Sequence, residues 1–261
     1  MLDVADYTKI YGNTLAVTKL SFATEAGQVV GVVGPNGAGK TTTMRAIAGI
    51  IPPSSGSLRI LGHDVQADPV RAKRHLAYVP DDPKLFDMLT VDEHLRFIAK
   101  VYEVADWAPR AEALLDRFEL TPKRRALAKE LSRGMRQKLA ICCAYLHEPE
   151  LLMFDEPMTG LDPHGIRTLK ESIRERAAAG ASVLVSSHLL ALVEDLTTHL
   201  LIMHRGQKLF MGSVEDARRS FASDDSSLED VFFRATAAAT QSAGAAATSP
   251  PPPPPFAGGG A

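Results

Sequence analysis

The sequence lacks the features of a membrane-spanning or secreted chain. Its longest run of apolar residues extends only from Leu139 to Leu146, far short of the roughly 18–20 that a helix needs to cross a bilayer. The first residues, Met1 to Asp6, include acids where a secretory signal would carry basic residues, and no small-residue cleavage site follows an apolar core. We therefore expect a chain that spans no membrane and stays in the cytoplasm.

Cysteine is scarce, and neither sign of charge is in excess. The only two cysteines, Cys142 and Cys143, are neighbours inside that apolar run, where cysteine usually packs as a small buried hydrophobe. With 29 Lys and Arg against 31 Asp and Glu, the formal net charge is −2, so the surplus of basic residues typical of nucleic-acid binding is missing. We expect structural cysteines and no nucleic-acid partner.

The chain has enough apolar residues to form a hydrophobic core. Of its 261 residues, 45% are hydrophobic, and the length fits one large or two small domains. From Ala235 the composition changes: the last 27 residues hold no charge, ten Ala, four Gly and the run Pro250 to Pro255. Such a segment buries too little apolar surface to offset its ordering entropy. We expect a folded domain over residues 1–234 and a disordered tail over 235–261.

Strand-like and helix-like stretches alternate along residues 1–234. Thr90-x-x-Glu93 is a capping box ahead of apolar residues at helical spacing, and Asp162-Pro163 starts another helix with Gly180 as its candidate C-cap. Residues from about 82 to 129 carry helices without an obvious strand. The alternation predicts an α/β fold with a largely parallel sheet and a helical insert. The strand-like stretches are Thr14–Phe22, Gln28–Val33, Leu58–Leu61, His75–Val79, Leu151–Phe154, Ser182–Ser186 and Leu200–Met203.

Residues 34–41 match the phosphate-loop pattern G-x-x-x-x-G-K-[ST], directly after the apolar strand Val29–Val33. Glycines allow successive backbone N–H groups to turn toward phosphates, and the helix that follows adds the positive end of its dipole. Lys40 supplies a point charge, Thr41 a hydroxyl for Mg²⁺ and Thr42 a donor toward the α-phosphate. The predicted nucleotide-binding residues of this segment are Gly34, Pro35, Asn36, Gly37, Ala38, Gly39, Lys40, Thr41 and Thr42.

The dinucleotide fingerprint G-x-G-x-x-G is the competing interpretation of this glycine-rich segment. It would need a glycine or alanine at position 42 after Gly37 and Gly39, where the chain has threonine. A glycine turn with an incidental lysine is the other alternative, but an unpaired lysine gains nothing at such a turn. The phosphate loop remains the favoured interpretation.

Later segments identify the kind of nucleotide-binding protein. Leu131-Ser132-Arg133-Gly134-Met135 resembles the signature motif of ATP-binding cassette (ABC) proteins, usually Leu-Ser-Gly-Gly-Gln, and it precedes an apolar strand that ends in Asp155 and Glu156. The resemblance covers residues 1–234 in family order. It implies a P-loop NTPase core with a mainly parallel sheet, an N-terminal antiparallel β region and an inserted helical subdomain.

The resemblance also implies a role for each motif residue. Asp155, which follows a buried strand, would hold Mg²⁺ with Thr41, and Glu156 would be the general base for the attacking water. His188, at another strand's end, would bond the γ-phosphate of ATP, and Lys40 completes the catalytic set. The remaining implied positions are Tyr11, which stacks on adenine; Ser132 and Gly134, which contact ATP held by a second subunit; and Asp162, which lines the interface between the subunits.

Two positions depart from the family pattern. Where the glutamine loop usually reads aromatic-hydrophobic-Pro-Gln, the chain has Asp81, which keeps an acceptor for Mg²⁺ or water but adds charge beside the phosphates and cannot donate. The signature has Arg133 and Met135 in place of Gly and Gln. Both departures resemble the cassettes of multidrug and other hydrophobic-substrate exporters, as do Gln137-Lys138 and the closing segment Ser227–Phe232.

The resemblance therefore implies an ATP-hydrolysing subunit of an ABC transporter, peripheral on the cytoplasmic face of the plasma membrane. Its partners would be integral membrane permease subunits and a second ABC subunit, identical or related. We expect the permease to dock near residues 81–102, where Leu85, Phe86, Met88 and Leu89 are apolar, although core packing explains those four equally well. The alternative is a soluble non-transport ABC ATPase; its known classes carry coiled-coil insertions or two cassettes per chain, and this sequence has neither.

Overall fold

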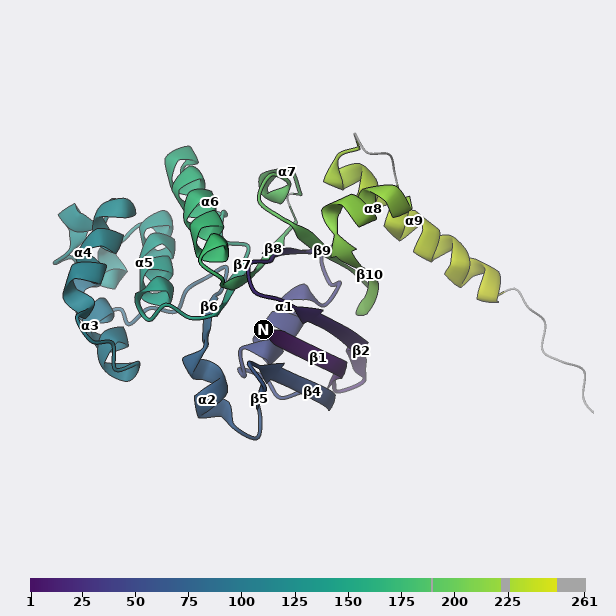
Figure 1. Ribbon diagram of the computed structural model, residues 1–261, viewed down its shortest axis with the longest axis horizontal. Helices are drawn as coiled ribbons and strands as arrows, with labels where there is room; N and C mark the ends of the chain where they lie inside the picture. The colour runs from purple at the N-terminus through teal and green to yellow at the C-terminus, as the bar shows by residue number, and fades with distance from the viewer. Residues whose placement is uncertain (189, 222–225, 248–261) are drawn as a thin grey trace, which may run out of the picture.

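The computed structural model describes residues 1–188, 190–221 and 226–247, and its strands form two sheets (Figure 1). The central sheet has six strands in the order β10-β9-β3-β8-β7-β6. All neighbours are parallel except β10, which runs antiparallel to β9. This sheet confirms the α/β class and the mainly parallel topology. Its strands are β3 (Val29–Val33), β6 (Leu76–Val79), β7 (Leu151–Asp155), β8 (Ser182–Ser187), β9 (His199–His204) and β10 (Gln207–Ser213).

The N-terminal sheet is antiparallel, with four strands in the order β2-β1-β4-β5. Strand β1 is absent from the predicted strands because its alternation changes phase. Leu2 and Val4 are buried, then Tyr7 and Lys9, and the register shifts between them at Asp6, whose φ is 49°. The strands are β1 (Leu2–Tyr11), β2 (Thr14–Thr24), β4 (Ser55–Ile60) and β5 (His63–Asp64).

Helices cover both faces of the central sheet. Helix α1 (Lys40–Ile47) packs between the two sheets, whereas α5 (Arg133–Leu146) and α6 (Pro163–Ala178) cover the other face. Along β8, Val183 and Val185 pack with the α5 and α6 side, and Leu184 packs with the α1 side. This two-sided burial explains why the parallel strands are apolar at nearly every position.

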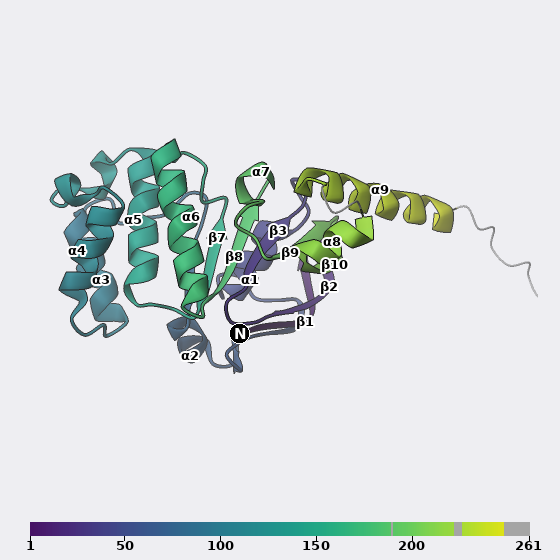
Figure 2. The same cartoon turned by 45° about the horizontal axis from the view of Figure 1, so that its top comes forward.

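A helical group projects from the core (Figure 2), on the side of the edge strand β6, which is labelled in Figure 1. Its helices are α3 (Val91–Val101) and α4 (Trp107–Arg117), which pack on α5, with short 3₁₀ turns at Thr121–Lys123 and Ala128–Glu130. The capping box is confirmed: Glu93 N donates to Thr90 Oγ1 at 3.2 Å, and Thr90 N donates to Glu93 Oε2 at 2.8 Å. The helical insert thus lies where the sequence predicts it, between β6 and β7.

The C-terminal part contains α7 (Leu190–Val193), α8 (Val214–Phe221) and α9 (Leu228–Ala247), and α2 (Pro69–Arg74) lies before β6. The predicted start of a disordered tail at residue 235 is wrong, because α9 continues to Ala247 and Ala235 is buried. Alanine has the highest helix propensity, so an alanine-rich extension prolongs a helix that is already packed. Residues 248–261, with the proline run, lie outside the described residues.

The expectation that the cysteines pack in an apolar segment is also met. Both cysteines are free; Cys142 is buried in α5, and Cys143 is half-buried beside it. Within the described ranges, no helix has both the length and the apolar character needed to cross a bilayer.

Candidate active site

A cavity of about 560 Å³ opens beside the phosphate loop, at the carboxyl ends of β3, β7 and β8. Open α/β sheets bind ligands at this edge. The cavity brings together residues that lie far apart in the sequence. Its lining includes the predicted residues Tyr11, Asn36, Gly37, Ala38, Gly39, Lys40, Thr41, Thr42, Asp81, Glu156 and His188.

The phosphate loop has the backbone that its glycines allow. Gly37 and Gly39 have φ of 80° and 98°, in the left-handed region that favours glycine. A Cβ on Gly34 would lie 2.4 Å from the carbonyl oxygen of Met203, so the loop leaves no room for a side chain there. Lys40 Nζ donates to Gly34 O at 2.6 Å, which places the amine over the loop. Burial lowers the pKa of Lys40, and the nearby Glu156 and Asp155 partly oppose that shift.

Asp155 lies buried at the end of β7, with both carboxylate oxygens in hydrogen bonds. Oδ1 accepts from Ser186 Oγ at 2.5 Å and from Thr41 Oγ1 at 3.3 Å, while Oδ2 accepts from Tyr78 OH at 3.2 Å. A threonine hydroxyl beside a fixed carboxylate suits Mg²⁺, which takes one or two protein oxygens together with substrate phosphates. The residues present therefore fit the predicted ion.

The sequence reasoning missed Tyr78 and Ser186 as partners of Asp155. Both lie on the strands that flank β7, and Ser186 is the residue directly paired with Asp155 in the parallel register. Burial and the neighbouring carboxylate raise the pKa of Tyr78, so it stays a hydrogen-bond donor. The strand order would have been the signal for both, but it cannot be read from one sequence.

Glu156 and His188 form a pair at the mouth of the cavity. His188 Nδ1 lies 2.9 Å from Glu156 Oε2, and Glu156 N donates to Ser186 Oγ at 3.2 Å. Burial raises the pKa of Glu156, and the hydrogen bond with His188 lowers it part of the way back. Glu156 also has a φ of 51°, unusual for a residue with a side chain and typical of functional sites. A fixed carboxylate with a raised pKa has the properties of a general base.

The signature residues and Asp162 do not line this cavity, and two of them cap helices. Ser132 caps α5 by accepting from Met135 N at 3.3 Å, and Asp162 caps α6 by accepting from Gly165 N at 3.2 Å. Gly134 abuts the loop after β7, since a Cβ there would lie 2.6 Å from Gly160 O. Their role toward a second subunit's ATP stays a prediction.

Asp81 lines the cavity, and its carboxylate pairs with the signature arginine. Arg133 Nη2 lies 3.0 Å from Asp81 Oδ1. The two departures from the family pattern therefore contact each other, a connection that the sequence alone does not indicate because 52 residues separate them.

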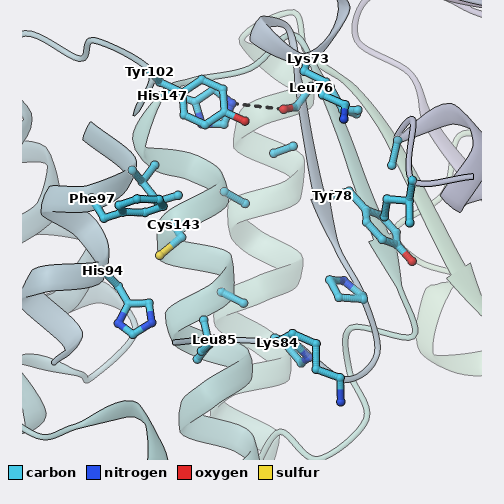
Figure 3. Close-up of a pocket in the computed structure, with 18 of the residues that line it drawn as sticks. Lys73, Leu76, Tyr78, Lys84, Leu85, His94, Phe97, Tyr102, Cys143 and His147 are labelled. Carbon is cyan, nitrogen blue, oxygen red and sulfur yellow. Dashed lines mark hydrogen bonds between the residues drawn. The ribbon is translucent and has the colours of Figure 1, made fainter. Parts of the chain in front are cut away.

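A second cavity, of about 610 Å³, lies between the core and the helical group (Figure 3). Tyr78 and Leu76 line it from the β6 side, and Phe97, Tyr102 and Cys143 line it from α3 and α5. We call this cavity the helical groove. Of the four apolar residues expected near it, Leu85 packs against the core and Leu89 is half-buried, whereas Phe86 and Met88 are exposed by 55% and 68%.

Comparison with known proteins identifies the family of the chain. The family model described as "ABC transporter" matches residues 17–159, and a model for an AAA domain matches residues 125–194. The chain is 36% identical over 234 residues to the ABC-type transporter ATP-binding protein EcsA of Bacillus subtilis (strain 168), covering 89% of this chain and 95% of the relative.

Two further similarities agree with that match. The Nod factor export ATP-binding protein I of Cupriavidus metallidurans is 33% identical over 214 residues, which cover 81% of this chain and 71% of the relative. A solved structure, described as the ATP-binding subunit of an ABC transporter, superposes with a TM-score of 0.87 at 35% identity and covers 90% of this chain and 99% of that one. The chain thus belongs to the ABC transporter family, as an ATP-binding subunit with ATPase activity that powers transport.

Proposed function

We propose that the cavity beside the phosphate loop binds ATP with Mg²⁺ and hydrolyses its γ-phosphoryl bond. The Glu156–His188 pair is the observation that carries this assignment, because it fixes a half-buried carboxylate in the same cavity as Lys40 and Thr41. The loop N–H groups and Lys40 bind the phosphates, and Tyr11, exposed by 46% at the cavity rim, offers its ring to the base.

Each polar side chain of the cavity then has one task. Glu156 accepts a proton from the attacking water at its carboxylate, and His188 holds that carboxylate and offers its other ring nitrogen to the γ-phosphate. Thr41 Oγ1 and Asp155 Oδ1 would hold Mg²⁺, with Tyr78 and Ser186 fixing the carboxylate. When bound, Mg²⁺ neutralises charge on the phosphate oxygens.

We infer that two such subunits close on two nucleotides. Ser132 and Gly134 lie at the N-terminus of α5, outside the chain's own cavity, and a helix N-terminus favours an anion. Asp162 lies at the start of α6, and its Oδ1 lies 3.6 Å from Nζ of Lys138 in the second turn of α5. A second ABC subunit, identical or related, would therefore complete each site.

We also propose that integral membrane subunits dock in the helical groove, with this subunit on the cytoplasmic face. Exposed apolar side chains at its border support this role, among them Ile50, Phe86 and Phe97. Their exposure favours docking over core packing for that part of the surface. The names of relatives such as the Nod factor export protein favour export as the direction of transport.

The test compares the wild type with Glu156→Gln. The wild type should hydrolyse ATP, and the variant should lose about 10²–10⁴-fold in kcat while it still binds ATP. On a sizing column with ATP and Mg²⁺, the variant should accumulate as a dimer. If the variant hydrolysed ATP as fast as the wild type, Glu156 would be excluded as the general base.

A further inference from the structure

The ion pair between Arg133 and Asp81 joins two segments that serve different nucleotides in the proposed function. Asp81 lines the chain's own cavity, together with Lys40 and Glu156. Arg133 is the first residue of α5, directly between Ser132 and Gly134. Its Nη2 lies 3.0 Å from Asp81 Oδ1, so one side chain spans from the signature segment to the cavity wall.

The side chain of Arg133 also lies beside Gly160. Gly160 has a φ of 83° and no side chain, and a Cβ there would lie 3.3 Å from Arg133 Cδ and 3.4 Å from its Cγ and Nε. The arginine therefore lies along the loop that begins at Glu156, where Thr159 N donates to Glu156 O at 3.2 Å. Three segments meet at this one side chain: the Asp81 loop, the signature and the loop after β7.

A neighbouring arginine fixes the same loop in a different way. Arg136 Nη2 donates to the carbonyl oxygen of Pro83 at 3.4 Å, and Asp82 pairs with Lys84. Arg136 thus contacts the loop backbone rather than the carboxylate that lines the cavity. It offers a matched control, since it carries the same charge one turn along the same helix.

We propose that Arg133 is a positioning residue for the nucleotide in the chain's own cavity. Its guanidinium neutralises the charge of the Asp81 carboxylate, so that this carboxylate does not repel the triphosphate. A negative charge at this position disfavours phosphate binding, and a guanidinium 3.0 Å away offsets that charge. This inference rests on the proposed function of the cavity. The pair is about half exposed, with side-chain exposures of 59% and 49%, so its effect is that of a solvent-screened pair.

The experiment is a double-mutant cycle on ATP affinity, measured by titration at protein concentrations too low for dimers to form. Arg133→Ala should weaken ATP binding about two- to fivefold, the range of an exposed ion pair. In the Asp81→Asn background, the same substitution should change the affinity little. Arg133→Lys should restore most of the loss, and about 1 M salt should shrink it, because salt screens exposed charges.

Three further measurements separate this effect from other roles. The coupling should be larger in titrations without Mg²⁺ than with it, because the repulsion acts on the phosphate charge that Mg²⁺ neutralises. Arg136→Ala should shift the affinity equally in the wild-type and Asp81→Asn backgrounds. Urea unfolding of the same four proteins without nucleotide should show a favourable coupling between Arg133 and Asp81.

The outcomes decide the proposal in both directions. Equal effects of Arg133→Ala in the two backgrounds, or tighter ATP binding by Arg133→Ala, would overturn it. If the wild type bound no ATP, the proposed function of the cavity would fail, and the unfolding cycle would still reveal whether the pair exists. If the unfolding cycle shows no coupling between Arg133 and Asp81, the proposed role of Arg133 is overturned even where ATP binds normally.

Discussion

At the scale of single residues, Glu156 combines two unfavourable features. It has a positive φ, and its carboxylate is half-buried beside Asp155, so the folded chain holds it against its preferences. His188 offsets part of the burial cost through the 2.9 Å contact. Both the rate of catalysis and the stability of the fold should therefore depend on pH through the ionisation of Glu156.

The pH profile of ATP hydrolysis should report that pKa. Activity requires the ionised carboxylate, so the rate should fall toward acid with an apparent pKa above the ordinary glutamate value of about 4.3. His188→Ala removes the interactions that lower the pKa of Glu156, and the acid limb should move to higher pH. Rates measured from pH 4.5 to 9 on both proteins give the shift. An acid limb that stays in place, or moves toward lower pH, contradicts this account of His188.

The stability of Glu156→Gln should depend on pH with a defined sign. Because the folded state raises the pKa of Glu156, the ionised carboxylate destabilises the fold at neutral pH and ceases to do so below the ordinary glutamate pKa. The variant should therefore melt at a higher temperature than the wild type at pH 7.5, and the difference should vanish near pH 4.

Glu175 is the control with the opposite sign. Its hydrogen bond with Arg117 lowers the pKa of this carboxyl, so the ionised form stabilises the fold above the ordinary glutamate pKa. Glu175→Gln should lower the melting temperature slightly at pH 7.5 and lose its effect as the pH falls. Calorimetric melts of both variants would check the two signs together; equal signs would contradict the assignment.

Some functional residues of the cavity can be predicted from the sequence, and others cannot. The phosphate loop is local, so its spacing alone predicts Lys40 and Thr41. The partners Tyr78 and Ser186 depend on strand order, and the contact of Arg133 with Asp81 depends on how the helical group sits on the core. Such contacts are set by tertiary packing, which no short motif contains.

At the scale of elements, the junction between α5 and the loop after β7 is close-packed. Gly134 faces the backbone oxygen of Gly160, and a Cβ there would approach it to 2.6 Å. A glycine-to-alanine change in a helix normally stabilises by about 1 kcal/mol. For Gly134→Ala, however, the backbone at Gly160 would have to move, and overpacking of this kind costs about 1–3 kcal/mol.

Gly134→Ala should therefore lower the free energy of unfolding in spite of the better helix propensity. Gly165→Ala, in α6, is the comparison, since its Cβ would meet the end of the Lys138 side chain at 3.1 Å and the Asp162 carboxylate at 2.7 Å, both of which can shift. We expect the loss for Gly165→Ala to be smaller. Urea denaturation of the two variants measures the difference, and a more stable Gly134→Ala protein would refute the close contact.

Elements with strong local signals were predictable. The caps of α3 and α6 and the apolar strands β7 and β8 are indicated by cap residues and by composition. Strand β1 was missed because its bulge at Asp6 breaks the alternation, and the extent of α9 was missed because its alanine-rich composition resembles that of a low-complexity tail. Pairing with the neighbouring strands decides the structure of β1, and the helix propensity of alanine prolongs α9.

At the scale of the whole molecule, the helical groove and the nucleotide cavity are separate surfaces. Phe86 and Phe97 contact each other edge to face at 5.3 Å and lie at the groove. The double variant Phe86→Glu/Phe97→Glu should lose co-purification with integral membrane proteins, because charge on the apolar surface disfavours docking. ATP-dependent dimer formation in the Glu156→Gln background should remain.

Val70→Glu serves as the control for added charge, since Val70 is 68% exposed on α2 and does not line the groove. It should leave co-purification unchanged. Detergent extraction followed by pull-down and mass spectrometry would compare the variants. Retention of the membrane protein by the double variant would exclude the groove as the docking surface.

The C-terminal helices pack on the central sheet in a small hydrophobic cluster, which includes residues next to the phosphate loop and to His188. Leu228, Val231 and Ala235 of α9 pack in one cluster with Val33, the residue before the phosphate loop, and with Leu190, two residues after His188. Segments with small cores open before the rest of a domain does. Warming should therefore release α8 and α9 first, and their release would free both the phosphate loop and His188, so that activity is lost at a temperature where the central sheet is still intact.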